Sequence, residues 1–322
     1  MAWLVTGGAG YIGAHITREI LASNRDVVVL DDLSTGLQTR VPENVPLVHA
    51  NITDPKAVSS VFEKHKIDGI LHLAARKQVG ESVERPTFYW QENVIGFFNI
   101  LTAMQQHGVK NLVFSSSAAV YGQPVKALDS LISELDECHP INPYGATKLA
   151  GEQLSQAFVL SDGFKVVALR YFNVAGAGDN SLGDPFALNL IPIVFEEITN
   201  NRRPLIFGND YPTPDGTCVR DYIHVQDLAQ GHLATMNFVE QADPIFTTIN
   251  LGTGHGSSVS EVISEIQNVT GIDFQPEVVA RRVGDPAKLV ADPAKAKDLL
   301  NWQSQLTLTE MVESAWSAFQ TK

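Results

Sequence analysis

Residues 6–13 read TGGAGYIG and follow the apolar run WLV at positions 3–5. The run predicts a buried strand, and the residues from position 11 onward have helical spacing. Gly7, Gly10 and Gly13 stand between the two. Glycine there permits a tight turn and lets backbone N–H groups approach an anion at the positive end of a helix. The spacing is GxxGxxG rather than the GxGxxG of many dehydrogenases. We therefore predict a turn that binds the pyrophosphate of a dinucleotide.

The next apolar run, DVVVLD at 26–31, ends in Asp31, which lies 18 residues after Gly13. An acid at the end of the second strand can accept both hydroxyl groups of an adenosine ribose. Its charge would repel a 2′-phosphate, and the following DDLSTG contains no arginine to offset that repulsion. These residues predict NAD rather than NADP.

Short apolar runs alternate with helical patterns through the first half of the chain. This alternation is typical of a parallel sheet that is covered on both faces, so we predict an α/β fold with a doubly wound, Rossmann-type sheet. The expected strands are 3–7, 26–31, 47–51, 69–74, 111–116 and 165–172, with 246–252 returning to the sheet. The expected helices are 11–23, 55–65, 87–107, 144–160, 188–200, 225–238, 258–270 and 307–319.

The sequence pattern changes after about residue 175, where loops rich in Gly, Pro and Asp (176–186, 208–218 and 281–287) separate shorter helices. We expect an NAD-binding domain over residues 1–175 and a smaller, interleaved α/β substrate domain over 176–322. Segments near 220–255 are expected to return to the first domain.

Composition narrows the function classes. The chain has 322 residues and a formal net charge of −13, which argues against a nucleic-acid partner. Cys138 and Cys218 lie far apart and lack metal-ligand spacing, so we expect free thiols, a reducing compartment and no metal. The opening MAWLVTGG contains no basic segment before an apolar one, and no apolar run is long enough to span a membrane. These features predict a cytoplasmic protein without a membrane partner.

Residues 142–152 read NPYGATKLAGE and place Tyr144 and Lys148 on one face of a predicted helix. Upstream, FSSSAAVYG (114–122) ends a strand in three serines, which should face the ligand crevice at the carboxyl ends of the strands. A serine followed by Tyr-x-x-x-Lys resembles the short-chain dehydrogenase/reductase superfamily. That resemblance implies that Tyr144 transfers a proton, that Ser117 binds the same oxygen, and that Lys148 favours the phenolate and holds the nicotinamide ribose.

Longer motifs extend the resemblance over nearly the whole chain. HLAARKQVGESVERP, LRYFNVAGA, GNDYPTPDGTCVRDYIHVQDLA and RRVGDPAKLVAD, together with the motifs above, are similar to those of the UDP-glucose 4-epimerase family. This resemblance implies reversible epimerisation of UDP-glucose and UDP-galactose at C4. The sugar is oxidised to a 4-ketose by tightly bound NAD, turns about its bond to the diphosphate, and takes the hydride back on its other face. A homodimer packed through helices such as 87–107 and 144–160 is also implied.

The resemblance assigns site residues position by position. Besides Gly7, Gly10, Gly13, Asp31, Tyr144 and Lys148, the implied cofactor contacts are Tyr11, Ile12, Asp32, Asn51, Ile52, Leu73, Ala74, Ala75, Lys77, Asn93, Ser115 and Phe172. Besides Ser117 and Tyr144, the implied substrate contacts are Asn173, Asn189, Leu190, Phe207, Arg220, Arg282, Asp285 and Leu289.

Three positions depart from the family pattern. Asn51 replaces an Asp that accepts from the adenine amino group, which an amide carbonyl can still do. Glu92 replaces an Asn beside the nicotinamide ribose. Leu289 is intermediate between the bulky residue of hexose-specific members and the small residue of members that accept N-acetylated sugars.

Alternative functions are distinguished by other residues. Activity on UDP-GlcNAc and UDP-GalNAc is disfavoured by Leu289 but stays open. Sugar-nucleotide dehydratases and decarboxylases place carboxylates where this chain has Ala118 and Ala119, so a second proton transfer lacks its acid and base. A sugar-nucleotide dehydrogenase would require added NAD. A non-catalytic NAD-binding module would not need the three residues Ser117, Tyr144 and Lys148.

Overall fold

The computed structural model describes residues 2–124, 127, 129–282 and 285–321, so positions 283–284 of the predicted loop 281–287 lie outside the described residues. A seven-stranded sheet forms the centre of the larger lobe, in the order β10-β6-β5-β4-β1-β2-β3. Every neighbouring pair in it is parallel. Its strands are β1 (Ala2–Thr6), β2 (Asp26–Asp31), β3 (Leu47–His49), β4 (Ile67–His72), β5 (Asn111–Ser115), β6 (Lys165–Tyr171) and β10 (Ile245–Leu251).

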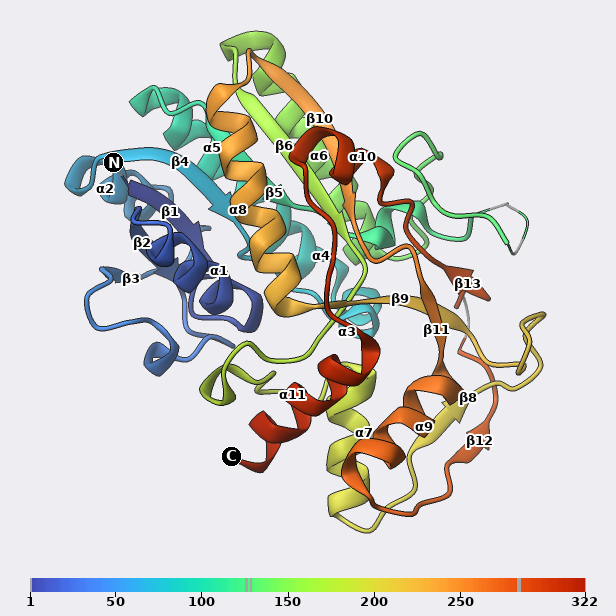
Figure 1. Ribbon diagram of the computed structural model, residues 1–322. Helices are drawn as coiled ribbons and strands as arrows, with labels where there is room; N and C mark the ends of the chain where they lie inside the picture. The colour runs from blue at the N-terminus through green and yellow to red at the C-terminus, as the bar shows by residue number, and fades with distance from the viewer. Residues whose placement is uncertain (1, 125–126, 128, 283–284, 322) are drawn as a thin grey trace.

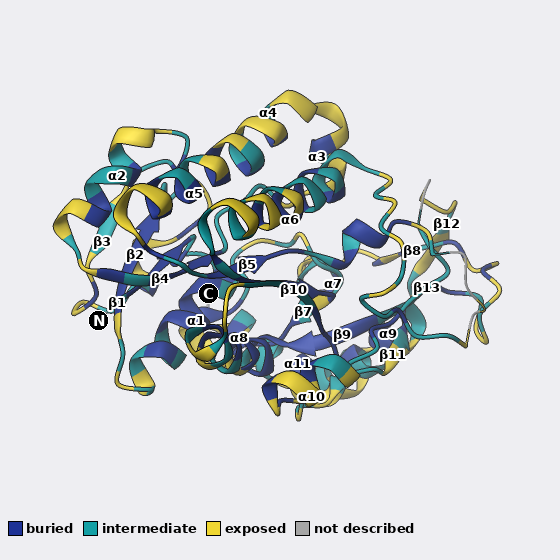
Figure 2. Cartoon of the chain, turned by 90° about the horizontal axis from the view of Figure 1, so that it is seen from above, coloured by how far each residue is buried: buried dark blue, intermediate teal, exposed yellow. Residues whose placement is uncertain are grey.

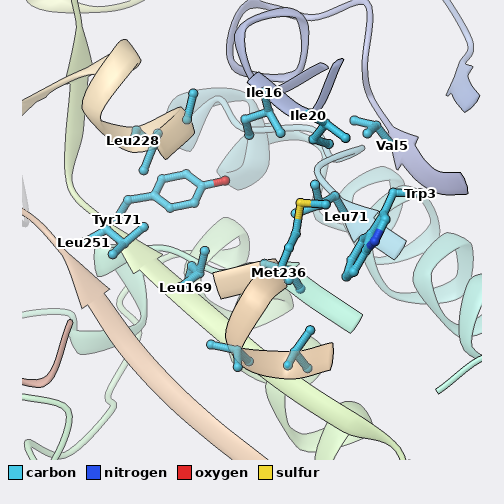
Figure 3. Packing of buried hydrophobic residues seen from close by; sticks show 14 of the residues in the cluster. Trp3, Val5, Ile16, Ile20, Leu71, Leu169, Tyr171, Leu228, Met236 and Leu251 are labelled. Carbon is cyan, nitrogen blue, oxygen red and sulfur yellow. The ribbon is translucent and has the colours of Figure 1, made fainter. Parts of the chain in front are cut away.

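Helices cover both faces of this sheet, as the alternating sequence predicts, and Figure 2 shows the three layers. Helices α1 (Tyr11–Ala22) and α8 (Val225–Gln241) lie on one face, where Trp3, Leu71 and Met236 belong to one buried cluster (Figure 3). Helices α2 (Pro55–Lys64), α5 (Gly96–His107) and α6 (Pro143–Asp162) cover the other face. Strands buried on both sides must be apolar throughout, which explains the continuous Val, Ile and Leu runs.

A smaller lobe packs around its own apolar cluster (Figure 1). Its helices are α7 (Leu190–Thr199), α9 (Val259–Thr270) and α11 (Leu308–Gln320), and α10 (Ala294–Leu300) packs against α8. Strand β9 (Val219–His224) pairs with β7 (Asn173–Ala175), β11 (Gly256–Ser258) and β13 (Lys288–Leu289), while β8 (Leu205–Phe207) pairs with β12 (Glu277–Val279). The chain returns to the main sheet at β10, so the expected position of strand 246–252 is confirmed.

The helix predicted over 87–107 lies at the expected residues, but it is not α-helical throughout. The structure has α3 (Val79–Glu84), α4 (Pro86–Trp90), a π-helical turn η2 (Gln91–Ile95) and then α5. Asn93 lies in the wide π turn, and its side chain reaches inward to the backbone of Arg76 and to Thr147. The polar anchor and the wide turn occur together, as is frequent at functional sites.

Short 3₁₀ turns complete the chain, namely η1 (Gln38–Arg40), η3 (Ala118–Tyr121) and η4 (Asn180–Leu182). Within the described residues, none of the helices is both long and apolar enough to cross a membrane. The same part of the chain contains no cluster of His, Cys, Asp and Glu suited to a metal ion. Cys138 and Cys218 are free thiols.

Candidate active site

The glycine turn after β1 is shaped by two close backbone approaches. Gly7 has a φ of 74°, and a Cβ there would lie 2.8 Å from the backbone nitrogen of Ala74. A Cβ at Gly13 would lie 2.1 Å from the carbonyl oxygen of Gly7. Gly10 caps α1 without a side-chain hydrogen bond, so the first N–H groups of the helix stay open toward a ligand. Free N–H groups at the positive end of a helix suit a pyrophosphate.

Asp31 ends β2 beside this turn. Its Oδ2 accepts from the N–H of Ala9 at 2.9 Å, and its Oδ1 accepts from the N–H of Leu33 at 2.9 Å. Burial raises the pKa of this carboxyl group, and the two N–H donors oppose that shift. A Cβ at Gly36 would lie 2.8 Å from Oδ1, so the loop passes closely over the carboxylate.

A cleft of about 390 Å³ runs over the carboxyl ends of the central strands. This is the edge at which doubly wound sheets bind their ligands. Its walls include most of the predicted cofactor residues, namely Gly7, Gly10, Tyr11, Ile12, Gly13, Asp31, Asp32, Asn51, Ile52, Leu73, Ala74, Ala75, Lys77, Ser115, Tyr144 and Lys148. Because the open N-terminus of α1 and the carboxylate of Asp31 share one cleft, the residues present fit a dinucleotide.

Two predicted cofactor residues lie behind the cleft wall. Asn93 accepts from the N–H of Arg76 at 2.7 Å and donates to the carbonyl oxygen of Arg76 at 3.0 Å. Phe172 packs in a buried cluster with Ala118, Val120 and Tyr121. Both residues are placed to support segments beside the cleft. Asn93 supports the loop after β4, and Phe172 supports residues 116–122 after β5, which we call the serine loop.

Tyr144 and Lys148 come from the first turns of α6, which Asn142 caps by accepting from the N–H of Gly145 at 2.8 Å. Lys148 Nζ donates to the carbonyl oxygen of Ser115 at 2.6 Å and lies 6.0 Å from the centre of the Tyr144 ring. Burial lowers the pKa of Lys148 to about 7. Burial also raises the pKa of the Tyr144 phenol, and a hydrogen bond with Ser117 opposes that shift. In the chain without NAD, burial disfavours the charged form of both Tyr144 and Lys148. The phenolate that we expect at Tyr144 depends on the positive nicotinamide ring as well as on Lys148.

Ser117 begins the 3₁₀ turn after β5, and its Oγ accepts from the N–H of Ala119 at 3.2 Å. Its side chain lies close enough to Tyr144 to oppose the rise in the pKa of that phenol, so the residues after β5 meet the start of α6. The residues that follow, Ala118 and Ala119, carry no acid or base. The structure thus brings together Ser117, Tyr144 and Lys148, with Tyr144 and Lys148 on the cleft wall.

A buried charge network lies behind the serine loop and was missed by the sequence reasoning. Glu152 accepts from Ser116 Oγ at 2.5 Å and from Arg170 Nε at 2.9 Å, and Arg170 Nη2 lies 2.6 Å from its other oxygen. Arg170 Nη1 also donates to Tyr121, whose hydroxyl group donates to Asn250. No spacing rule joins these residues, because they come from the loop after β5, from η3, and from α6, β6 and β10.

The predicted substrate residues after 170 fall into separate contacts. Arg220 Nη2 lies 3.6 Å from Asp285, so Arg220 does not pair with its neighbour Asp221, which accepts from backbone N–H groups of Thr253 and Gly254. The Arg282 guanidinium lies over the Phe207 ring at 3.8 Å from its centre.

The remaining substrate candidates lie on strands and on the start of α7. Leu289 pairs with Arg220 between β13 and β9, and it packs against the cluster that contains Ala118 and Phe172. Asn189 donates to Asp184 at 2.8 Å, and Leu190 packs in the smaller lobe. Asn173 is exposed on β7. Asp285 also lines a second cavity of about 220 Å³, which lies beside Tyr211 and Arg281.

Arg76 is a further cleft residue that the sequence reasoning missed. It follows β4, and its guanidinium donates to Asp32, Ser34 and Glu92 at 3.1, 2.7 and 3.1 Å. The prediction of NAD rested partly on the lack of an arginine near Asp32, whereas folding brings Arg76 there from 44 residues away. Asp32 and Glu92 neutralise its charge, so the acidic character of this end of the cleft persists.

The comparison with protein families assigns the fold and the site to a class. Residues 3–252 match the model of the NAD dependent epimerase/dehydratase family. The chain therefore belongs to that family.

Within this family, the chain is similar to UDP-glucose 4-epimerases. The enzyme of Halalkalibacterium halodurans is 44% identical, over 98% of this chain and 95% of the relative. That of Bacillus subtilis is 43% identical, over 98% and 96%. A crystal structure of the Stenotrophomonas maltophila enzyme with bound NAD and formylated UDP-arabinopyranose has a TM-score of 0.94 at 38% identity, covering 100% of this chain and 98% of that one. The predicted fold class and family are confirmed.

Proposed function

We propose that this protein interconverts UDP-glucose and UDP-galactose through transient oxidation at C4, with NAD as a tightly retained cofactor. The observation that carries this proposal is the convergence of Ser117, Tyr144 and Lys148 beside the glycine-turn cleft. Its relatives of similar length are UDP-glucose 4-epimerases, and the Bifidobacterium longum structure at 36% identity was solved with NAD⁺ and UDP.

Tyr144 acts as the proton acceptor for the C4 hydroxyl group, and Ser117 shares a hydrogen bond with the same oxygen. NAD, when bound, supplies the hydride acceptor and a positive charge near Tyr144. That charge is needed, because burial alone raises the pKa of the phenol. Lys148 stays anchored to the carbonyl oxygen of Ser115, with its remaining N–H groups free to hold ribose hydroxyl groups.

The cofactor residues act in two groups. The open N-terminus of α1 and Lys77 hold phosphates, and Asp31 accepts from the adenosine ribose. The other cleft-lining residues shape the walls, while Asn93 and Phe172 support them from behind. The preference of the site for NAD over NADP is set by Asp31 and by the surplus of carboxylates around Arg76.

The nucleotide part of the substrate binds to the smaller lobe, which residues 176–322 form apart from α8 and β10, since these two return to the cofactor domain. Arg220 and Arg282 hold the diphosphate, since a guanidinium can donate two hydrogen bonds to phosphate oxygens. Asp285 accepts from the uridine ribose, Phe207 borders the uracil, and Asn173, Asn189 and Leu190 line the path of the sugar. Anchoring only the nucleotide leaves the hexose free to turn between its two hydride transfers.

Leu289 sets the sugar range in this proposal. It packs on the buried cluster that contains Ala118, the residue that follows Ser117 in the chain. A leucine there disfavours an N-acetyl group, although a relative from Campylobacter jejuni at 38% identity is a UDP-Glc/GlcNAc 4-epimerase. Hexose substrates are the main proposal, and N-acetylated sugars are the second.

We also infer a homodimer formed through the outer faces of α3–α6, and a cytoplasmic location suited to the two free thiols. The apolar residues exposed on α3, α4, η2 and α5 (Val79, Val83, Trp90, Ile95 and Phe98) support the dimer.

The deciding experiment is conversion of UDP-galactose by purified protein with no NAD added, with UDP-glucose detected by a coupled enzyme. We expect turnover in wild type and its loss in Tyr144→Phe, whose UDP binding should remain. Conversion that needs added NAD would disprove tight retention. NADH accumulation without UDP-glucose would identify a dehydrogenase and overturn the proposal.

A further inference from the structure

The loop after β4 crosses the adenosine end of the cleft as a bridge of side chains. Arg76 leaves this loop and reaches Asp32 and Ser34 on the loop after β2. The same guanidinium reaches Glu92 on η2. Arg76, Asp32, Ser34 and Glu92 all line the dinucleotide cleft. One guanidinium therefore joins two separate walls of that cleft.

The bridge is held in place at both ends of Arg76. Asn93 bonds the N–H and the carbonyl oxygen of Arg76, which fixes its backbone to η2. The guanidinium lies 5.2 Å from the centre of the Phe88 ring, and the side chain is only 21% exposed. An arginine fixed by its backbone, by two carboxylates and by an aromatic ring loses little further entropy when a ligand lies beneath it.

Asn51 belongs to the same bridge. Its Oδ1 accepts from both the N–H and the hydroxyl group of Thr53 at 2.8 Å, and its Nδ2 donates to Asp32 at 3.2 Å and Glu92 at 3.3 Å. An amide oxygen has two lone pairs, and Thr53 uses both. Asn51 thus connects Thr53 to both carboxylates of the bridge.

We propose that Arg76, held between Asp32 and Glu92, closes the adenosine end of the cleft over bound NAD and slows its release. The inference deepens the proposed function, which requires the cofactor to stay bound through both hydride transfers. Asp31 would hold the adenosine ribose next to Asp32, and the planar guanidinium of Arg76 could then stack on the adenine. Release of NAD then requires the two partly exposed ion pairs to open.

The test is the rate at which bound NAD leaves the purified holoenzyme, measured by exchange against excess isotopically labelled NAD. Arg76→Met should release NAD about tenfold to a hundredfold faster, as expected for the loss of two charge-assisted hydrogen bonds. Glu92→Gln keeps the shape of the bridge and removes one ion pair, so its release rate should fall between those of wild type and Arg76→Met. Arg76→Lys should restore part of the retention.

Arg85→Met is the matched control. Arg85 also lines the cleft and lies over Phe88, but its ion pair is with Glu81 of the neighbouring helical turn, so it does not bridge two walls. We expect a wild-type release rate in this variant. Raised ionic strength should speed release from wild type but not from Arg76→Met, because salt screens partly exposed ion pairs.

An unchanged rate in Arg76→Met, or equal acceleration in Arg85→Met, would overturn the inference. The same holds if salt affects wild type and Arg76→Met alike. These readouts do not depend on catalysis. A wild-type protein that holds NAD without converting UDP-galactose would disprove the proposed function, while the release rates would still decide the role of Arg76.

Discussion

Tyr144 and Lys148 are acidic and basic groups that burial affects in the same direction, toward the neutral form. Burial raises the pKa of Tyr144 and lowers that of Lys148 to about 7. Because the phenol and the amine are buried and favour their neutral forms, a charged ligand that binds beside them strongly changes the pKa of each. The geometry of the site thus leaves its activation to the ligand that enters the cleft.

This burial has a consequence for stability that can be measured. An unfolded Lys148 has a pKa of 10.5, and the folded value is about 7. Below pH 7 both states hold the proton, so the penalty for the buried charge is complete. Between pH 7 and 10.5 the unfolded state binds more protons, so the penalty diminishes as pH rises.

We therefore expect the free energy of unfolding of NAD-free wild type to rise from pH 7 to pH 9 relative to that of Lys148→Met, by about 2 kcal/mol. Urea denaturation of both proteins at the two pH values measures this difference. Parallel changes in the two proteins would show that Lys148 keeps an ordinary pKa in the folded chain.

At the scale of elements, the inner strands of the main sheet were predictable because they are largely buried on both faces and read as near-continuous apolar runs. The edge strands β3 and β10 are only partly buried. The strands of the smaller lobe were not predictable. Residues 288–289 form a strand of two residues, and VRDYIH at 219–224 mixes charged and apolar side chains. Such segments become strands only through the partners that folding brings to them, and the π turn at 91–95 likewise depends on the tertiary contacts of Asn93.

The link between β5, α6 and β6 is another contact that no local pattern predicts, and it anchors the serine loop. Glu152→Gln should lower the free energy of unfolding by about 3–5 kcal/mol, because Arg170 would stay buried without its carboxylate. The matched control is Glu197→Gln. Glu197 also binds an arginine through two bonds, to Arg202 at 2.8 and 3.0 Å, but that arginine side chain is 55% exposed.

For the exposed pair we expect a loss of no more than about 1 kcal/mol. Chemical denaturation of the two variants separates the cases. Equal losses would mean that the buried network contributes no more than a surface ion pair, and that the serine loop is held by its own backbone.

At the scale of the whole molecule, the residues that line the cleft could be predicted well from the sequence. The residues that hold its walls together could not. Gly7, Asp31 and Tyr144 could be placed because parallel strands bring their carboxyl ends to one edge. Arg76 and Asp32 lie 44 positions apart, and Glu152 is bound by Arg170 of β6 and by Ser116 of the loop after β5. Pairs of this kind follow from the packing of whole elements, which a single sequence does not display.

Packing of whole elements also leaves one outer surface apolar. Figure 2 shows exposed residues along the outward faces of α4 and α6. Val83, Ile95 and Phe98 are among the large apolar side chains exposed on α3, η2 and α5, and Phe98 makes an edge contact with Phe158 of α6. Apolar residues grouped on adjoining helices are typical of a protein interface, and a second copy of the chain is the partner we propose.

Ile95→Lys should therefore convert the dimer to a monomer, because a lysine at the centre of a symmetric interface would be buried near its own copy. Sedimentation velocity at micromolar concentration measures the change in mass. Leu135→Lys is the control, since Leu135 is 95% exposed but lies outside these helices, and this variant should stay dimeric. A monomeric wild type, or an Ile95→Lys variant that remains a dimer, would place the interface elsewhere and leave the apolar face of α3–α5 without its proposed partner.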